Sequence, residues 1–574
     1  MNRQRRHNEK GAALIMALFV LVILLALSAI FLLQVVQESR MAWHERELMK
    51  SFYIAEGGIS HGLITLDELI NTDLYDAVSS ANPAVVSVRA DRYADDGDAL
   101  GFLMEFAEID DVPIFTLNEE GTEASYSSLA STALGSGTFD YDIVITAKDD
   151  PVVVTVDQWD FPYNYRIESN ADNSGLSKTV LLSGDFTVRI QRDNFARYAL
   201  FTDHHTMPSG SLVWFTDRTN FAGPVHTNQR FSFARNPGSV FDGAVTQREA
   251  TARFQNLGFP VLIDADNNLP NDAPVFNTGF TRSVDPINLA SSITEVEISS
   301  QATGRENFIG EGIFVANSAG NLTGGIFVRG TASITMSTDA SNNAVYNVVQ
   351  GANARTITVN RETEQTTISQ TGVPDVIYNG LPDGIDDVGT IIYVDGAISA
   401  LSGTVQHDTP VTVASRSDIV ISNHIRYENY IPATGTPGTA GYVQPNATDT
   451  ENLMGILSWG GNVRIGTTAP NNLDVHGVVM ARNGIFTVDD YTNLTVGSRG
   501  SVTLLGGAIT NYYGAFGQFN AVTGIQVSGY GRNFVYDGRM IQGSSPPYFP
   551  SLNTFIAFTN DIADKLIWQE GDNQ

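Results

Sequence analysis

The pattern of apolar and polar positions divides the chain into a helical beginning and a long β-rich remainder. Residues 1–10 are polar and basic, whereas residues 11–33 form an uncharged, mostly apolar run. At about 1.5 Å per residue, a helix over this run is about 34 Å long, enough to cross the hydrocarbon core of a bilayer. Because the residues before it are basic, we expect them to stay in the cytoplasm and the chain after Gln34 to lie outside it.

The helical pattern continues beyond the apolar run. Residues 34–50 contain neither Pro nor Gly, and Glu47 and Lys50 have the i,i+3 spacing of a helical ion pair. Apolar residues then recur at helical spacing as far as Ile70, which predicts one helix of about 55 residues. We expect the pair Gly57-Gly58 to bend or loosen it. Residues 71–138 have a mixed pattern that predicts turns.

Four stretches with strand character follow, separated by turn residues, and the clearest alternation of apolar and polar positions lies in 163–169 and 178–191. They predict a small antiparallel meander. A helix extension packed on this sheet would form one domain over residues 34–192.

From Phe195 the pattern changes to short apolar stretches between Gly, Asn and Asp, with irregular spacing. This pattern predicts a large all-β ectodomain over residues 193–574. An irregular parallel β-helix, or solenoid, with turns at Gly and Asn fits best, and a pair of β-sandwiches is the alternative. The expected fold class of the whole chain is therefore α+β.

The N-terminal residues resemble those of a known family. Lys10-Gly11-Ala12-Ala13-Leu14 precedes the apolar run, and Ala55-Glu56-Gly57-Gly58-Ile59 follows further along. Residues 5–65 are similar to the N-terminal region of PilX-type minor pilins of type IV pilus systems. The resemblance implies a basic prepilin leader at 1–11, cleavage by a prepilin peptidase between Gly11 and Ala12, and retention of 12–33 as a transmembrane and filament-core helix. It also implies assembly with other pilin subunits, with Met16 and Glu56 as assembly residues.

Cleavage after Gly11 places Met16 at the fifth position of the mature chain, where major pilins usually carry a glutamate. An isolated carboxylate in lipid is costly unless it is paired. A subunit with Met16 need not satisfy such a pair, so we expect it at a filament tip or in initiation. A plain signal anchor and a secretory signal peptide remain alternative interpretations of the apolar run.

Residues 195–570 also resemble a largely uncharacterised bacterial family attached to such N-termini. The resemblance rests on short segments that include Phe195–Phe201, Gly223–Asn228 and Pro546–Pro550. It implies no particular chemistry.

Composition narrows the function classes. The 574 residues include 63 Asp and Glu against 33 Lys and Arg, a net charge of −30, which argues against nucleic acid as a partner. The chain has no Cys, which excludes disulfides, Cys-ligated metals and a cysteine nucleophile.

Two oxygen-rich turns are candidate calcium sites: Asp264, Asp266 and Asn268 in the first, and Asp383, Asp386 and Asp387 in the second. The first lacks the glycine and the final glutamate of an EF-hand loop. Structural calcium is the one cofactor that these patterns suggest. The pair Asp386-Asp387 is also a candidate for sugar cleavage, which uses paired carboxylates. The histidines are candidate metal ligands: His204, His205 and His226. Neither group has the further residues that such chemistry requires.

The sequence therefore predicts a non-enzymatic, minor pilin-like subunit of a type IV pilus or related filament. It would cross the inner membrane once, and its β-rich head would be exposed for adhesion to a glycan, a host or an abiotic surface, or for subunit contacts. The alternative is a membrane-anchored surface protein that binds or degrades carbohydrate.

Overall fold

The computed structural model describes residues 5–106, 108–109, 112–155, 157–216, 219–234, 239–256, 259–289, 293–432, 434, 443, 451–520, 525–541, 543–559, 562 and 567–570. The chain forms two compact units. The first, which we call the helix unit, comprises Met1–Gln191 and Thr554–Gln574. The second, the β unit, comprises Arg192–Asn553. The β unit is thus inserted into the helix unit.

The end of the chain therefore differs from the expected single region over 193–574. Strand β39 (Ser551–Phe558) is a neighbour of β9 (Leu176–Asn194) in the sheet of the helix unit, and β40 (Ile567–Glu570) pairs with β9 as well. Phe555 is buried in the core of that unit, 5.7 Å from the ring of Trp159. Backbone pairing with β9 and burial of Phe555 explain why this segment belongs to the helix unit.

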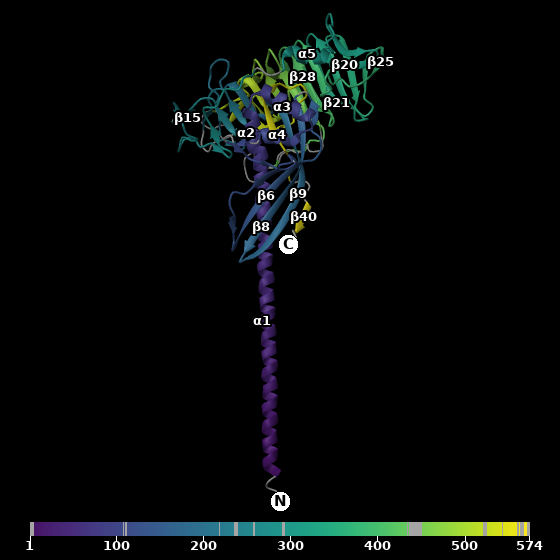
Figure 1. Cartoon of the computed structure of the whole chain (residues 1–574). Helices are drawn as coiled ribbons and strands as arrows, with labels where there is room; N and C mark the ends of the chain where they lie inside the picture. The colour runs from purple at the N-terminus through teal and green to yellow at the C-terminus, as the bar shows by residue number, and fades with distance from the viewer. Residues whose placement is uncertain are drawn as a thin grey trace. The chain divides into compact units, whose positions relative to one another are not determined.

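One long N-terminal helix opens the chain, followed by many strands (Figure 1). Helix α1 (Arg5–Glu68) continues through a π-helical turn, Leu69–Leu74, into α2 (Tyr75–Ser80). The helical path over Gly11–Ser80 is long and apolar enough to span a membrane by length and composition.

Two more helices, α3 (Pro83–Asp95) and α4 (Ala99–Phe106), occupy residues that were expected to form turns. Asn82 accepts a hydrogen bond from the amide of Ala84 (3.0 Å), and Pro83 stands at the first helical position, so a new helix begins there. The expectation of turns was wrong because Val86, Ala90, Phe102 and Leu103 are buried at helical spacing.

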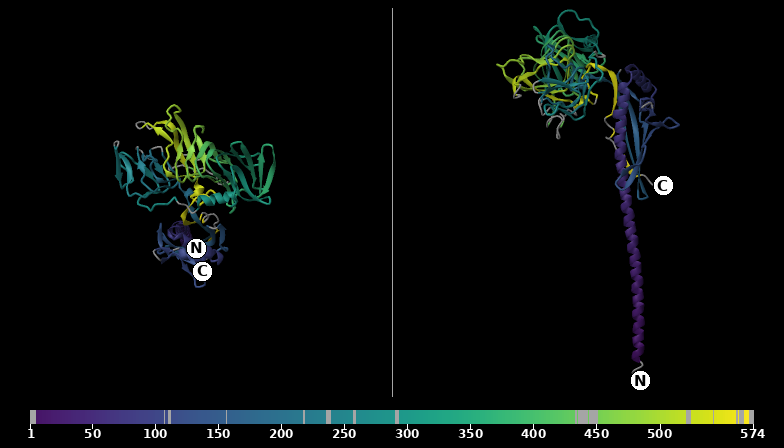
Figure 2. Two further views of the ribbon diagram at one scale, coloured as in Figure 1. Left: turned by 90° about the horizontal axis from the view of Figure 1, so that it is seen from above. Right: turned by 90° about the vertical axis from the view of Figure 1, so that its left-hand side faces the viewer.

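The helix unit contains the expected antiparallel sheet, with order β3-β4-β6-β8-β9-β39. Its bounds are Thr116–Leu117 (β3), Ala124–Ser127 (β4), Thr132–Leu134 (β5), Gly137–Ala147 (β6), Val152–Thr155 (β7) and Gln158–Asn173 (β8). Strand β5 pairs with β6, and β7 with β8. A separate pair is formed by β1 (Glu108–Ile109) and β2 (Val112–Pro113). Alternate residues of β8, among them Tyr163, Tyr165 and Ile167, are buried, and α1 lies along one face of the sheet (Figure 2).

The β unit is built mainly from parallel strands. One ladder runs in the spatial order β18-β14-β11-β10-β36-β33-β30-β28-β26-β20. Its strands are Phe280–Thr281, Val245–Gln247, Val225–Thr227, Leu200–His204, Ala508–Tyr512, Val478–Ala481, Met454–Ser458, Val411–Ser415, Thr390–Asp395 and Asn321–Arg329. The pairing of β10 with β36 joins an early and a late part of the unit.

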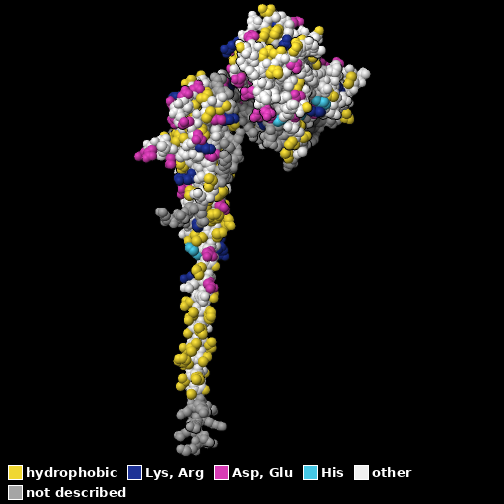
Figure 3. All heavy atoms as spheres, turned by 90° about the vertical axis from the view of Figure 1, so that its right-hand side faces the viewer, with side chains coloured by type: hydrophobic (Ala, Val, Ile, Leu, Met, Phe, Trp, Pro, Cys, Tyr) yellow, Lys and Arg dark blue, Asp and Glu magenta, His cyan; other side chains and the backbone are white. Residues whose placement is uncertain are grey.

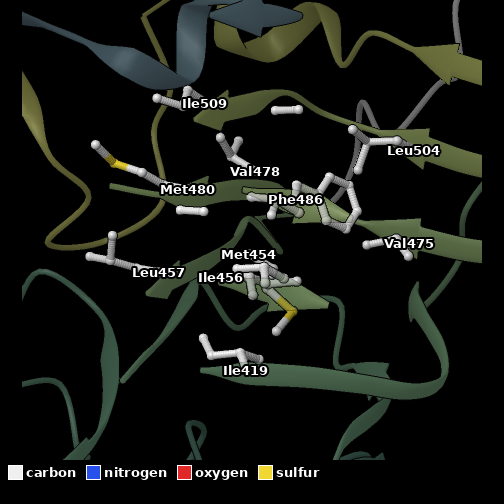
Figure 4. Packing of buried hydrophobic residues seen from close by; sticks show 14 of the residues in the cluster. Ile419, Met454, Ile456, Leu457, Val475, Val478, Met480, Phe486, Leu504 and Ile509 are labelled. Atoms are coloured by element: carbon white, nitrogen blue, oxygen red, sulfur yellow. The ribbon is translucent and has the colours of Figure 1, made fainter. Parts of the chain in front are cut away.

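A second parallel ladder consists of β21 (Ala332–Thr338), β27 (Ile398–Val405), β29 (Ile419–Tyr427), β32 (Leu473–His476), β35 (Ser498–Leu505) and β38 (Gln526–Val535). From β29 a further branch continues to β31 (Val463–Ile465) and β34 (Phe486–Val488). Buried apolar residues are stacked from strand to strand: Leu457, Met480 and Ile509 occupy matching positions on β30, β33 and β36 (Figure 4).

An antiparallel sheet extends from β21 through β22 (Ala344–Gln350), β23 (Asn353–Asn360), β24 (Gln365–Gln370) and β25 (Val373–Asn379). Strand β19 (Gly312–Ser318) pairs with β20, and α5 (Glu295–Thr303) starts with a capping box formed by Thr294 and Glu297. The remaining short strands are Ser232–Phe233 (β12), Val240–Phe241 (β13), Ala252–Asn256 (β15), Phe259–Ile263 (β16), Val275–Phe276 (β17) and Gly517–Phe519 (β37).

Candidate functional site

The N-terminal part of α1 is a long apolar stretch that is exposed along its whole length. Every residue from 11 to 46 is exposed, and Met16, Phe19 and Leu33 expose 74%, 68% and 64% of their surface. Figure 3 shows the hydrophobic side chains along this stretch. Since burial of one large apolar side chain is worth about 1.5–3 kcal/mol, lipid or apolar protein around residues 11–33 would be favourable. We call these residues the exposed apolar segment.

The residues expected to take part in processing lie at the start of this segment. Helix α1 begins at Arg5, so it runs without interruption through the junction of Gly11 and Ala12. A Cβ atom added to Gly11 would meet no other atom within 4 Å. Residues 1–4 of the expected leader lie outside the described residues. The junction and Met16 are therefore free of contacts with the rest of the described chain.

Burial of α1 begins at Glu47. Its carboxylate accepts hydrogen bonds from Lys50 Nζ and from Asn173 Nδ2, each at 2.8 Å, and is 5% exposed. The bond from Lys50, and then that from Asn173, lower the pKa of Glu47. One turn later, Ser51 Oγ donates to the carbonyl of Leu176 (2.7 Å). The expected ion pair of Glu47 and Lys50 is thus confirmed, and polar groups of the β8–β9 hairpin bind the helix at this level.

Further along, glycines bring α1 close to the sheet. A Cβ atom added to Gly58 would lie 2.8 Å from Cδ2 of Phe139, and one added to Gly62 would lie 2.7 Å from Cγ2 of Ile167. The expectation that the glycine pair loosens the helix was wrong, because α1 continues unbroken and the missing side chains make room for the sheet. The spacing of Gly58 and Gly62, one helical turn, was a signal of close packing that the sequence reasoning missed.

The opposite side of the same helix stays open. Met49, Tyr53 and Ile64 expose 54%, 60% and 58% of their surface. Glu56, the second expected assembly residue, is partly exposed, and its carbonyl accepts a hydrogen bond from Ser60 Oγ (3.1 Å). Unpartnered apolar surface therefore continues from the exposed apolar segment onto the part of α1 that packs on the sheet.

The first calcium candidate is occupied by an arginine. Asp266 Oδ1 lies 2.6 Å from Arg282 Nη2, and Asp264 Oδ1 lies 3.9 Å from Arg282 Nε. The third candidate, Asn268, makes backbone bonds with Asp272 and donates from Nδ2 to the carbonyl of Gln255 (3.1 Å). The three side chains do not converge on one point.

The second calcium candidate is also bound by neighbouring side chains. Asp383 is buried, and it accepts hydrogen bonds from Thr390 Oγ1 (2.9 Å) and Arg361 Nη2 (3.2 Å). Burial raises the pKa of Asp383 despite the nearby guanidinium. Asp386 accepts from Gln301 Nε2 (2.5 Å), and Asp387 has a positive φ of 52°. Across the described ranges, no group of three or more His, Asp or Glu side chains is placed to hold a metal ion.

The three histidines near the start of the β unit lie in different surroundings. His226 is buried and bonds Thr246 (2.8 Å) and Asn228 (3.0 Å) through its two ring nitrogens. His204 stacks on Tyr512 with ring centres 4.4 Å apart. His205 is buried among Phe215, Phe231 and Tyr513, where burial lowers its pKa to about 3. Their surroundings are those of core and packing residues.

Comparison with known proteins gives one partial match. Residues 160–249 match the model of a family described as "Domain of unknown function (DUF4900)". The match begins in β8 of the helix unit and ends just beyond β14 of the β unit. No curated protein matches the chain, and no solved structure matches it.

Proposed function

We propose that this chain is a membrane-anchored, pilin-like minor subunit of a type IV pilus or related filament, acting at the tip or in initiation and without enzymatic activity. The observation that carries the proposal is the continuity of α1. One helix is exposed and mostly apolar over residues 11–33 and packs on an antiparallel sheet from Glu47 onward. A subunit that must reside first in a bilayer and then among other apolar helices needs this arrangement.

Met16 supports the tip or initiating position. The exposed apolar segment carries no charged residue, so it offers no carboxylate to pair with the amino terminus of a neighbouring subunit. A charged group left unpaired in lipid costs at least about 2.5 kcal/mol near the centre of the span. A subunit at the end of a filament has fewer such neighbours to satisfy.

The β unit would be the outward-facing head, and we propose that it is a parallel β-solenoid rather than a pair of sandwiches. Parallel registers repeated over many strands support this, since sandwiches are built from antiparallel strands. Glycines of successive turns also stack. A Cβ atom on Gly396 would lie 2.6 Å from the carbonyl carbon of Gly330, and one on Gly506 would lie 2.7 Å from that of Gly477. Only small residues fit at such repeated corners.

The orientation follows from the same proposal. The basic residues before Gly11 would stay in the cytoplasm, a prepilin peptidase would cut before Ala12, and both units would face away from the cytoplasm. The protein would then move from the inner membrane to the cell surface with the filament.

Mass spectrometry of the membrane-bound protein tests the proposal, in cells with and without the prepilin peptidase. We expect a mature chain that starts at Ala12 only when the peptidase is present. Gly11→Val should block the cut, whereas the matched change Ala13→Val should not. A chain that still starts at Met1 with the peptidase present would favour the alternative of a surface protein held by an uncleaved anchor. Labelling along whole filaments at major-subunit abundance would contradict the tip or initiating position.

A further inference from the structure

Three buried polar atoms of the β unit have no hydrogen-bond partner among the residues that the structure describes. They are Nε2 of His205, the hydroxyl oxygen of Tyr513 and Nε of Arg532. His205 and Tyr513 expose only 1% and 3% of their surface. Because buried polar groups in proteins are nearly always hydrogen-bonded, an orphaned group of this kind indicates a partner from outside the chain.

The three side chains lie close together, and we call them the His205 cluster. The ring centres of His205 and Tyr513 are 5.1 Å apart, and the guanidinium carbon of Arg532 lies 4.7 Å from the centre of the Tyr513 ring. On β38, Arg532 alternates with the buried residues Tyr530 and Phe534, so it points to the same side of the strand as they do. The strand therefore directs a cation towards the core of the β unit.

The charges around the His205 cluster are positive. Within the described residues, neither Arg532 nor Arg253 forms an ion pair with a carboxylate. Burial, then Arg532 and Arg253, lower the pKa of His205 to about 3, and no described carboxylate opposes them. A guanidinium that turns towards a core loses hydration, which is costly unless an opposite charge pairs with it. In a chain with 63 acidic and 33 basic residues, this arginine is left for an anion that the chain does not supply.

The groups around the cluster favour a small anion. A guanidinium N–H, a tyrosine hydroxyl and one tautomer of a neutral imidazole all donate hydrogen bonds. Aromatic rings fill the surroundings: the ring centres of Phe215 and Phe231 each lie 4.8 Å from that of His205, and Arg532 lies 5.2 Å from the centre of Phe516. Ring edges carry partial positive charge, but they offer no strong donors to the several oxygens of phosphate or sulfate. A single-atom anion needs only the few donors that are present.

We propose that the His205 cluster binds a chloride ion, held by the guanidinium of Arg532 and the hydroxyl of Tyr513, with the imidazole of His205 beside it. The ion would neutralise the guanidinium where no described carboxylate does, and it would stabilise the folded β unit. The inference goes beyond the proposed function and does not rest on it.

Thermal unfolding of the full-length chain in detergent micelles tests the inference, with sodium gluconate exchanged for sodium chloride at constant ionic strength. Constant ionic strength keeps the screening of other charges the same. The melting temperature should rise by several degrees between chloride-free buffer and about 0.2 M chloride, because a ligand that binds only the folded state stabilises it. The line width of the chloride NMR signal measures binding itself.

Two variants and a control separate chloride binding from packing. Tyr513→Phe removes one donor, so it should weaken chloride binding about tenfold. Without chloride, this variant should be as stable as the native chain or more stable, because it loses an unpartnered buried hydroxyl. Arg532→Gln should abolish the response to chloride. Arg248→Gln removes an exposed charge from the β unit and should leave the response unchanged.

A melting temperature that does not change with chloride would overturn the inference. An equal response in folded Arg532→Gln would do the same, and so would native chloride affinity in Tyr513→Phe, which decides the matter if Arg532→Gln does not fold. A stronger response to sulfate than to chloride would identify an oxyanion as the ligand and would also overturn it. None of these results depends on where the mature chain begins, so the inference and the proposed function fail separately.

Discussion

The side-chain amide of Asn173 donates a 2.8 Å hydrogen bond to the carboxylate of Glu47, at the first buried position of α1. Asn173 is the last residue of β8, just before the turn that leads into β9. The contact therefore marks the level where the helix passes from full exposure to packing on the sheet. Between this level and the N-terminus, residues 11–46 of α1 are exposed.

Removal of this hydrogen bond should destabilise the packing of α1 on the β8–β9 hairpin. We expect Asn173→Ala to lower the melting temperature by a few degrees, because Glu47 then loses one of its two side-chain donors. Hydrogen exchange of the amides around Ser51 should rise at the same time. Asn164→Ala, at an exposed position of the same strand, is the control. Equal effects of the two changes would contradict a specific role of Asn173.

Close packing at Gly62 should make this position intolerant of even one methyl group. Gly62→Ala gains about 1 kcal/mol in helix propensity but forces a contact with Ile167 that costs about 1–3 kcal/mol, so we expect net destabilisation. The control Ser60→Ala, on the exposed side of α1, should be neutral or slightly stabilising. Urea unfolding measures both.

A double-mutant cycle separates overpacking at Gly62 from other causes. Ile167→Val removes one methyl group opposite Gly62, so Gly62→Ala should cost less in that background than in the native chain. Strictly additive effects would show that the two residues do not share the space seen in the structure.

Arg282 should stabilise the β unit by covering Phe280. Its guanidinium lies 4.1 Å from the centre of the Phe280 ring and is held by Asp266. Cation–π contacts of this kind contribute about 0.5–2 kcal/mol, so Arg282→Gln should lower the urea midpoint. Because Asp266 bonds the arginine, we expect a calcium chelator to leave the midpoint of the native chain unchanged. A chelator-induced decrease would mean that this turn does bind calcium.

Acid should destabilise the β unit through two buried histidines. Burial is the main cause that lowers the pKa of His205 to about 3, with Arg532 and Arg253 adding to it, and burial lowers the pKa of His476 to about 4. In the unfolded chain both should titrate near 6.5. The unfolded state therefore binds more protons below pH 6.5, so stability should be full above that pH and fall as the pH drops towards 4.

At pH 4.5 the free energy of unfolding should be lower by on the order of 2 kcal/mol for each histidine. Urea midpoints measured between pH 7 and 4.5 give the dependence of stability on pH. His205→Phe should reduce it, whereas His44→Gln, at an exposed position of α1, should not. An unchanged slope in His205→Phe would contradict burial of a neutral His205 as a source of acid sensitivity.

Features that depend on neighbours along the chain could be predicted from the sequence, whereas features that depend on contacts between distant residues could not. The helix over residues 11–33 and the alternation in 163–169 depend on neighbours along the chain, and both are present. Helices α3 and α4 were not predicted, because the mixed pattern of residues 71–138 indicated turns. Their apolar positions, such as Phe102 and Leu103, make sense only once the core that buries them is known. The calcium candidates were selected by local spacing, which gave no sign that Arg282 lies against Asp266 and Arg361 against Asp383.

By itself, the sequence determined that an uncharged apolar helical run follows the basic first residues, that an alternating sheet comes next, and that a long β-rich region follows the sheet. These properties depend on hydrophobic periodicity and charge, which are local. Only the tertiary structure decided that the last strands return to the first unit, that β10 pairs with β36, and that glycines on α1 bring it close to the sheet. Such pairings join segments far apart in the chain, and their free energy arises from burial and backbone hydrogen bonds that exist only once both segments are in place.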